Sequence, residues 1–261
     1  RQIIAPHLTL ELPLVDLQNV SKSGRQKVAF QLMREEALRP FDLSRGPLLR
    51  AKLFRLDSRE HIILITMHHI ISDGWSMGIL ISELSVLYEA FSQAQASPLP
   101  PLPLQYVDFA HWQRQRLVGD ALEQHMNYWK QQLAGIPALH ELPTDHPRSS
   151  EQRFQGNKLP IFLPSSLTTQ LKHLSQQKGT TLFMTLLTAF GTLLSRYSGQ
   201  SDIVIGSPIA NRTNSQTESL IGFFVNTLVM RTDFSGDPTF RQLLARGREV
   251  CLGAYGHQDL P

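Results

Sequence analysis

Short apolar runs alternate along the chain with apolar residues repeated at helical spacing. Residues 61–67 form a near-continuous apolar run, which is typical of a buried strand. Residues 74–91 have the helical repeat, and Ser72 or Asp73 can cap the start of this helix. Thr180 is expected to cap a later helix in the same way. Further helices are expected at residues 25–38, 105–118, 120–134, 165–178, 181–197 and 239–255, and further strands at 48–56, 158–163, 202–208 and 223–233. This alternation predicts an α/β fold.

Two local patterns organise these elements. The strands at 48–56 and 61–67 are expected to pair as an antiparallel hairpin around a polar turn. Prolines recur from residue 137 to residue 164 and indicate an irregular stretch, which is the candidate boundary between two parts of the chain. We therefore expect one part at residues 1–140 and another at residues 141–261.

Two adjacent histidines stand where the strand at 61–67 meets the helix at 74–91. A neutral imidazole can take a proton from a nucleophile and return it later. The positive end of the following helix favours the neutral, basic form of His69. Adjacent side chains of a strand point to opposite faces, so His68 and His69 are not expected to enter one pocket together. Gly74 leaves room for a substrate to approach the backbone closely.

Other interpretations of this segment remain open. Asp73 can be a helix cap and no more, and a buried, hydrogen-bonded histidine is commoner than a catalytic one. A metal site is disfavoured, because consecutive strand residues point apart and no third histidine lies at a suitable spacing. No nucleophile elbow occurs, and the single cysteine, Cys251, is expected to be a small buried hydrophobe in a helix. These residues favour transfer chemistry in which a histidine assists the nucleophile of a substrate.

The composition limits the classes of partner. At 261 residues, 41% of them hydrophobic, the chain can form a sizeable core. Its 25 basic and 22 acidic residues give a net charge of +3 without a dense basic run, so nucleic acid is not an expected partner. The most apolar helix is too short and too rich in threonine to span a bilayer, and no membrane association is expected. One cysteine fits a reducing compartment, so a cytoplasmic location is expected.

Five segments carry motifs in a fixed order. They are MHHIISDGWS at 67–76, YVDFAHW at 106–112, IGSPIANR at 205–212, IGFFVNTL at 221–228 followed by Arg231, and HQDLP at 257–261. The first resembles the His-His-x-x-x-Asp-Gly signature of the condensation domains of nonribosomal peptide synthetases, and the others resemble further motifs of those domains. These domains share a superfamily with chloramphenicol acetyltransferase. The resemblance covers nearly the whole chain.

The resemblance implies two chloramphenicol acetyltransferase-like lobes in a V arrangement. The family's first, second and last motifs are absent, so the fold is expected to be truncated at both ends. Residues 1–140 would be part of the N-terminal lobe, with the histidine motif, and residues 141–261 part of the C-terminal lobe. The implied activity is that of an acyltransferase that forms amide bonds: an acceptor aminoacyl amine attacks a donor acyl or peptidyl thioester.

The resemblance also implies partners. Donor and acceptor are carried on phosphopantetheine arms of an upstream and a downstream peptidyl carrier domain, beside an adenylation domain, and the domain binds no cofactor of its own. Heterocyclization domains replace the histidines with aspartates, and epimerization domains tend towards Val-Ser-Trp after the glycine. Here Trp75-Ser76-Met77 follows instead, which favours a domain that joins an L-configured donor to an L-configured acceptor.

The resemblance assigns the candidate site residue by residue. The catalytic residue is His69; the supporting residues at the active site are His68, Asp73 and Gly74; the substrate channel is lined by Trp75, Ser76 and Asn226. In the family the aspartate pairs with an arginine, which the motif leaves unassigned and which an absent N-terminal part can supply. Asn226 fits a buried structural amide equally well, because a polar residue in an apolar strand needs a partner.

Two other functions stay open. The chain can be a condensation-like module that recruits partner enzymes or gates carriers without forming bonds. It can also be an O-acyltransferase of the same superfamily that acts on a free alcohol. The donor and acceptor amino acids cannot be read from the residues, because the wall of a tunnel is built from distant segments.

Overall fold

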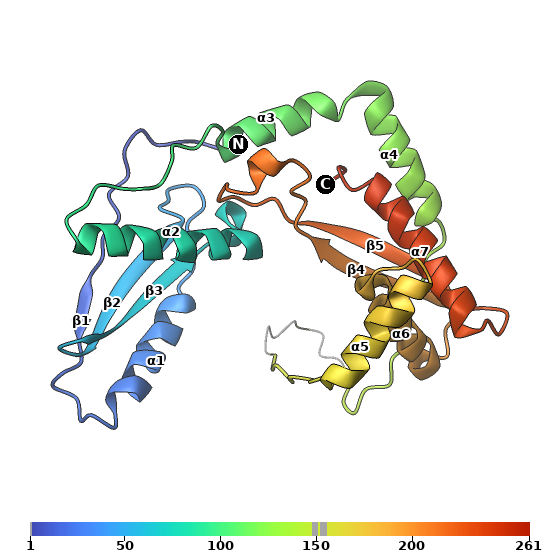
Figure 1. Ribbon diagram of the computed structural model, residues 1–261, viewed down its shortest axis with the longest axis horizontal. Coiled ribbons are helices and arrows are strands. Elements are labelled where there is room, and N and C mark those ends of the chain that lie inside the picture. The colour runs from blue at the N-terminus through green and yellow to red at the C-terminus, as the bar shows by residue number, and fades with distance from the viewer. Residues whose placement is uncertain (1, 148–150, 152–155) are drawn as a thin grey trace. The chain divides into compact units, whose positions relative to one another are not determined.

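The computed structural model describes residues 2–147, 151 and 156–261 (Figure 1). Its contacts divide the chain into two compact units. Unit 1 comprises Arg1–Asp108 and Arg212–Phe224, and unit 2 comprises Phe109–Asn211 and Val225–Pro261. Each unit contains helices and strands, which confirms the predicted mixed α/β class.

Unit 1 is built on a three-stranded sheet in the order β1-β2-β3. β2 and β3 pair antiparallel, which confirms the predicted hairpin, and the short β1 runs parallel to β2. The elements are β1 (Leu14–Asp16), α1 (Arg25–Ala37), β2 (Leu49–Asp57), β3 (Glu60–Met67), α2 (Gly74–Ser92) and the 3₁₀ turns His69–Ile71 and Ser215–Thr217. The histidine motif therefore occupies the short connection between β3 and α2.

α1 packs against β2 and β3 (Figure 1). The core between them centres on Phe54 and Ala29, which are both fully buried, with Leu17 and Leu56 beside them. Burial of a side chain the size of Leu or Phe stabilises the fold by about 1.5–3 kcal/mol. This core holds the hairpin in place, and the hairpin sets the point where the histidine motif begins.

A buried carboxylate on α1 ties the helix to the sheet. Glu36 is 3% exposed, and its oxygens lie 2.6 Å from Lys52 Nζ, 2.7 Å from Arg50 Nε and 3.2 Å from Arg39 Nη1. The hydrogen bond from Lys52 is the strongest influence, and together with the two arginines it outweighs the effect of burial. The pKa of Glu36 is thereby lowered from 4.5 to about 2.

Replacement of Glu36 by Gln is expected to lower the free energy of unfolding by about 2–3 kcal/mol near neutral pH. The expected cost is below the ~3–5 kcal/mol typical of a fully buried pair, because Arg50 and Lys52 reach solvent. A carboxyl whose pKa is lowered in the folded state stabilises above its unfolded pKa. That stabilisation is lost as the pH falls from about 4.5 towards about 2.

Hydrogen exchange of α1 and β2, measured from neutral to acidic pH, checks this prediction. Wild type and Glu36→Gln should converge as the pH falls. Glu35→Gln is the matched control. Glu35 precedes Glu36 in the chain but is exposed, and its side chain accepts one hydrogen bond from the side chain of Gln31. A stability difference that stays constant with pH would contradict the proposed charge network.

Unit 2 contains a two-stranded antiparallel sheet of β4 and β5. Its elements are α3 (Tyr106–Arg116), whose first residues belong to unit 1, α4 (Gly119–Gln132), α5 (Ser165–Gln177), α6 (Leu182–Ser198), β4 (Asp202–Ile209), β5 (Asn226–Asp233) and α7 (Phe240–Gly256). α7 packs on β5 and α6 (Figure 1). Cys251 is fully buried in the core of this unit, as predicted, and burial raises the pKa of its thiol to about 11.

The predicted strand at residues 158–163 is wrong. These residues have no regular secondary structure, and none of the described strands pairs with them. Prolines at 160 and 164 lack the backbone N–H that a strand ladder needs. The large apolar side chains of the segment are exposed: Leu159, Ile161 and Phe162.

Two predicted boundaries also change. Thr181, not Thr180, caps α6, because its side chain accepts a hydrogen bond from the N–H of Met184. β5 begins at Asn226 instead of residue 223, since the preceding residues form hydrogen bonds to the start of α2.

The predicted lobes at residues 1–140 and 141–261 differ from the compact units, and as lobes of a complete domain they stay a prediction. Among the described residues, no helix has the length and apolar character that a membrane span requires.

Candidate active site

The two histidines have different backbone conformations. The N–H of His68 donates to Leu48 O at 2.9 Å and so continues the pairing of the hairpin. His68 is extended and caps the following 3₁₀ turn, because its Nδ1 accepts from the N–H of Ile70 at 3.0 Å. His69 is the first residue of that turn. Their rings contact different aromatic residues: His68 meets Phe41 and His69 meets Phe223.

The imidazole of His69 is oriented by a backbone carbonyl. Its Nδ1 lies 2.6 Å from the carbonyl oxygen of Ser72. A carbonyl can only accept a hydrogen bond, so Nδ1 carries a proton. In the neutral ring Nε2 therefore holds the lone pair. The side chain is exposed, and the geometry leaves His69 able to accept a proton or a hydrogen bond through Nε2.

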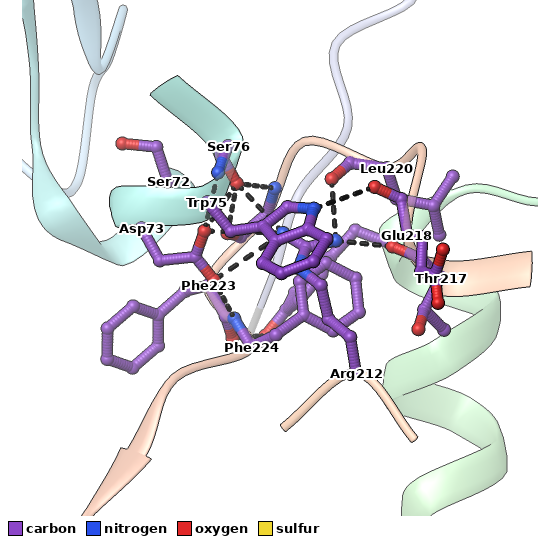
Figure 2. A network of polar contacts seen from close by, with 12 residues as sticks. Ser72, Asp73, Trp75, Ser76, Arg212, Thr217, Glu218, Leu220, Phe223 and Phe224 are labelled. Atoms are coloured by element: carbon purple, nitrogen blue, oxygen red, sulfur yellow. Dashed lines mark hydrogen bonds and ion pairs between the residues drawn. The ribbon is translucent and has the colours of Figure 1, made fainter. Parts of the chain in front are cut away.

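Asp73 is the N-cap of α2 and is 4% exposed. Its carboxylate accepts hydrogen bonds from the N–H of Ser76 at 2.8 Å and from the N–H of Phe224 at 3.0 Å (Figure 2). Burial by itself would raise the pKa of Asp73. The hydrogen bonds from Ser76 and Phe224, with the charge of Arg212, outweigh that effect and lower the pKa. Asp73 is thus a buried anion that joins two distant segments.

Arg212 is the cationic partner of Asp73, which the motif by itself leaves unassigned. Its Nη2 donates to Asp73 Oδ1 at 3.2 Å, and the two side chains are 1% and 2% exposed. Its Nη1 donates to the carbonyl oxygens of Thr217 and Leu220. Arg212 Nε is buried and has no acceptor among the described residues, but the guanidinium lies 4.0 Å from the ring centre of Phe224. That aromatic face partly compensates the missing hydrogen bond.

The remaining contacts fasten residues 212–224 to the start of α2 (Figure 2). Ser76 Oγ accepts from the N–H of Gly222 at 3.1 Å and lies 2.9 Å from its carbonyl oxygen. Trp75 Nε1 donates to the carbonyl oxygen of Glu218 at 2.9 Å. Neither bond was predicted, because each joins residues more than 140 positions apart in the chain.

A family model for the condensation domain matches residues 1–261. This chain belongs to the condensation domain family. The match agrees with the resemblance drawn from the motifs, and it extends over the segments between them. The buried Asp73–Arg212 pair is the arginine contact that the family resemblance implied.

Curated relatives of this condensation domain are large synthetases or parts of them. One of the linear gramicidin synthase proteins of Brevibacillus parabrevis is 54% identical over 260 residues, which are 100% of this chain and 3% of the relative. Phosphinothricin tripeptide synthetase PhsC of Streptomyces viridochromogenes is 43% identical over 100% of this chain and 24% of the relative. The chain thus spans a small part of the curated relatives it matches.

Solved structures give the same fold. The X-domain in a complex with OxyB from teicoplanin biosynthesis aligns with a TM-score of 0.83 at 27% identity, over 97% of this chain and 55% of that chain. A four-domain nonribosomal peptide synthetase, holo-AB3403 bound to AMP and glycine, aligns with a TM-score of 0.81 at 25% identity, over 97% of this chain and 19% of that chain. The family model thus supports the family from the sequence, and the solved structures support the fold from the coordinates.

Three other predicted residues of the condensation domain lie at the start of α2. Gly74 is exposed, and a Cβ added there would meet nothing within 4 Å. Trp75 is 48% exposed. Ser76 is fully buried, with its hydroxyl bonded to Asp73 and Gly222. Its assignment to a substrate channel stays a prediction, and its burial favours a structural role.

Asn226 belongs to unit 2, whereas Gly74, Trp75 and Ser76 belong to unit 1. Its Nδ2 donates to the carbonyl oxygens of Gln258 and Leu260 at 2.9 and 2.7 Å, and its Oδ1 accepts from the N–H of Thr227. The amide therefore anchors the last residues of the chain to the start of β5. These bonds favour the structural interpretation, and the channel role stays a prediction.

The structure adds three residues to the site that the sequence does not assign to it: Arg212, Tyr106 and Phe223. Each lies inside one of the recognised motifs, and this position is the only signal of a role in the site that the sequence offers. The motifs do not show which of these residues are in contact. Among the described residues, no group of three or more potential metal ligands occurs.

Proposed function

We propose that this condensation domain forms peptide bonds in nonribosomal peptide synthesis. The α-amine of an acceptor aminoacyl thioester attacks the carbonyl carbon of a donor acyl or peptidyl thioester. A C–N bond forms, the donor C–S bond breaks, and the donor thiol leaves as the amine loses a proton. Both substrates arrive on phosphopantetheine arms of carrier domains, and the condensation domain holds no cofactor of its own. Its place in a synthetase beside carrier and adenylation domains is part of this proposal.

The observation that carries the proposal is the orientation of His69. Its Nδ1 is committed to the Ser72 carbonyl, which leaves Nε2 as an acceptor on an exposed ring. A free α-amine titrates at about 7.7–8.0, so a usable neutral fraction exists near neutral pH. His69 therefore need not create the nucleophile. We propose that Nε2 orients the amine and accepts its proton as the tetrahedral species forms.

The neighbouring residues support this role in different ways. Asp73 and Arg212 are proposed as the buried pair that sets the start of α2, and His68 as a cap and packing residue of the turn. The open space at Gly74 and the exposed ring of Trp75 are proposed to face the substrates. The residues that follow Gly74 favour an L-configured donor and an L-configured acceptor.

A second function has one observation in its favour. The chain aligns with the X-domain that was solved in a complex with OxyB, with a TM-score of 0.83. A module of this fold that recruits another enzyme is therefore an alternative to a bond-forming domain. An O-acyltransferase that uses a free alcohol stays as a third candidate, because it would need the same histidine.

Reconstitution of the full-length protein separates these functions. The donor carrier is loaded with an acyl or peptidyl group and the acceptor carrier with an amino acid, and the acceptor is analysed by mass spectrometry of the intact carrier. We expect the condensed product on the acceptor arm, at a rate that depends on both loaded carriers. No product with any pair of loaded carriers would favour recruitment. Transfer to a soluble alcohol in the absence of an acceptor carrier would favour the O-acyltransferase.

A further inference from the structure

The ring of Phe223 lies against the imidazole of His69. Their centroids are 5.2 Å apart and the planes meet at 86°, which is an edge-to-face contact. The hydrogen bond to Ser72 O sets the direction of Nδ1. A bond at one atom leaves the ring free to tilt about that direction, and an aromatic neighbour restricts this motion. Ser72 and Phe223 together therefore determine where Nε2 points.

The backbone on both sides of Phe223 is bound to the start of α2. Gly222 bonds through its N–H to Ser76 Oγ, and the N–H of Phe224 donates to Asp73 Oδ2 at 3.0 Å. Phe223 itself is held from a third direction, because its carbonyl oxygen accepts from Tyr106 Oη at 2.9 Å. Three consecutive residues are thus fixed, and the side chain of the middle one meets His69.

Tyr106 is itself closely packed on this segment. Its ring meets Phe224 edge to face, with centroids 5.1 Å apart. A Cβ at position 222 would lie 2.3 Å from Tyr106 Cδ2, so the close approach of this ring requires the glycine. Burial, and to a smaller extent the negative charge of Asp73, raise the pKa of Tyr106. The phenol therefore stays neutral and remains a donor to the Phe223 carbonyl.

We propose that Tyr106 and Phe223 are positioning residues for His69: the Tyr106 hydroxyl fixes the backbone of Phe223, and the Phe223 ring fixes the imidazole. This inference rests on the proposed function, in which His69 Nε2 meets the acceptor amine. Neither residue touches the reacting atoms in this scheme. The segment Arg212–Phe224 then has a second role besides holding Arg212, because it carries the ring that orients the histidine.

The test uses Tyr106→Phe and Phe223→Leu in the full-length protein, under single-turnover conditions with loaded carriers. Tyr106→Phe removes one hydroxyl and keeps the ring over Gly222, so the local packing is retained. A small displacement of a catalytic group costs up to about 10²-fold. We expect the rate at saturation to fall about 10-fold in Tyr106→Phe and about 10–100-fold in Phe223→Leu, with the half-saturating carrier concentration unchanged. Phe223→Tyr keeps the aromatic edge and should restore the rate to within about threefold of wild type.

The same two variants in a His69→Ala background distinguish positioning from a general structural role. If they act through His69, they should cause no further loss once the imidazole is absent. Tyr128→Phe is the matched control, because in unit 2 its ring likewise lies over a glycine, Gly253, and stacks on His257. It should leave the rate unchanged.

Each outcome has a distinct meaning. An equal loss from Tyr106→Phe with and without His69, or a wild-type rate in both single variants, overturns the inference and leaves the proposed function standing. A wild-type rate in His69→Ala overturns the proposed role of His69, and the inference with it, whereas the absence of any condensed product overturns the proposed function. A slow His69→Ala enzyme in which the other variants have no further effect supports both.

Discussion

Replacement of His69 by alanine is expected to slow dipeptide formation by about 10²–10⁴-fold, the usual contribution of a positioned acid–base group. The side chain is exposed, and the polar bond of its ring is the local one to Ser72 O, so its loss should leave the fold intact. The effect should therefore appear in the rate constant of the chemical step. Single-turnover measurement with both carriers loaded gives this constant directly, without the contribution of product release.

His68 provides the matched control for this experiment. It is the adjacent imidazole, but its Nδ1 caps the 3₁₀ turn and its ring meets Phe41 at a centroid distance of 5.9 Å. His68→Ala should lower stability modestly, by about 0.5–2 kcal/mol as for loss of a cap, with a smaller loss of rate than His69→Ala. Unchanged single-turnover rates in His69→Ala would falsify the base role. Equal losses in both variants would indicate that the turn, and not the imidazole of His69, matters.

Replacement of Arg212 by alanine is expected to destabilise unit 1 by about 3–5 kcal/mol, because it leaves a buried anion without its cation. Asp73 has a 2% exposed side chain and cannot regain water without a local opening. The carbonyl oxygens of Thr217 and Leu220 lose their donor at the same time. The segment Arg212–Phe224 should then separate from the start of α2, and condensation activity should fall with it.

Hydrogen exchange followed by mass spectrometry measures this effect segment by segment. A loss of 3–5 kcal/mol corresponds to an increase on the order of 10²–10⁴-fold in the opening equilibrium, at about 1.4 kcal/mol per factor of ten. The amides to follow are those of Ser76, Gly222 and Phe224, whose bonds close the network. Protection at wild-type level in Arg212→Ala would show that the pair does not hold the segment.

Arg45→Ala is the matched control for Arg212→Ala. Arg45 also pairs with an aspartate of unit 1, Asp42, but at 3.9 Å and with side chains that are 85% and 60% exposed. Surface pairs of this kind contribute about 0–1 kcal/mol. The two variants remove the same guanidinium from opposite environments, so the difference between them measures the consequence of burial.

Local order along the chain was largely predictable from the sequence. The hairpin of β2 and β3, the helix expected at 74–91 with a cap at Ser72 or Asp73, and the buried position of Cys251 all follow from periodicity and from the preferences of neighbouring residues. Such features depend on contacts between residues a few positions apart, or on burial summed over a short run. The strand expected at 158–163 failed because a strand needs a partner, and an apolar composition does not supply one.

The sequence by itself determined the family, His69 as a candidate catalytic residue and the order of the elements around it. Tertiary structure alone decided which residues surround that histidine. Arg212 meets Asp73 across 139 positions, and Tyr106 reaches Phe223 across 117. These pairings depend on how folded segments pack, because a buried carboxylate or carbonyl oxygen accepts a hydrogen bond from whichever donor the packing brings within about 3 Å. No periodicity in the chain encodes these long-range contacts. The motifs therefore contain the residues of the candidate site, but only the tertiary structure shows which of them are in contact.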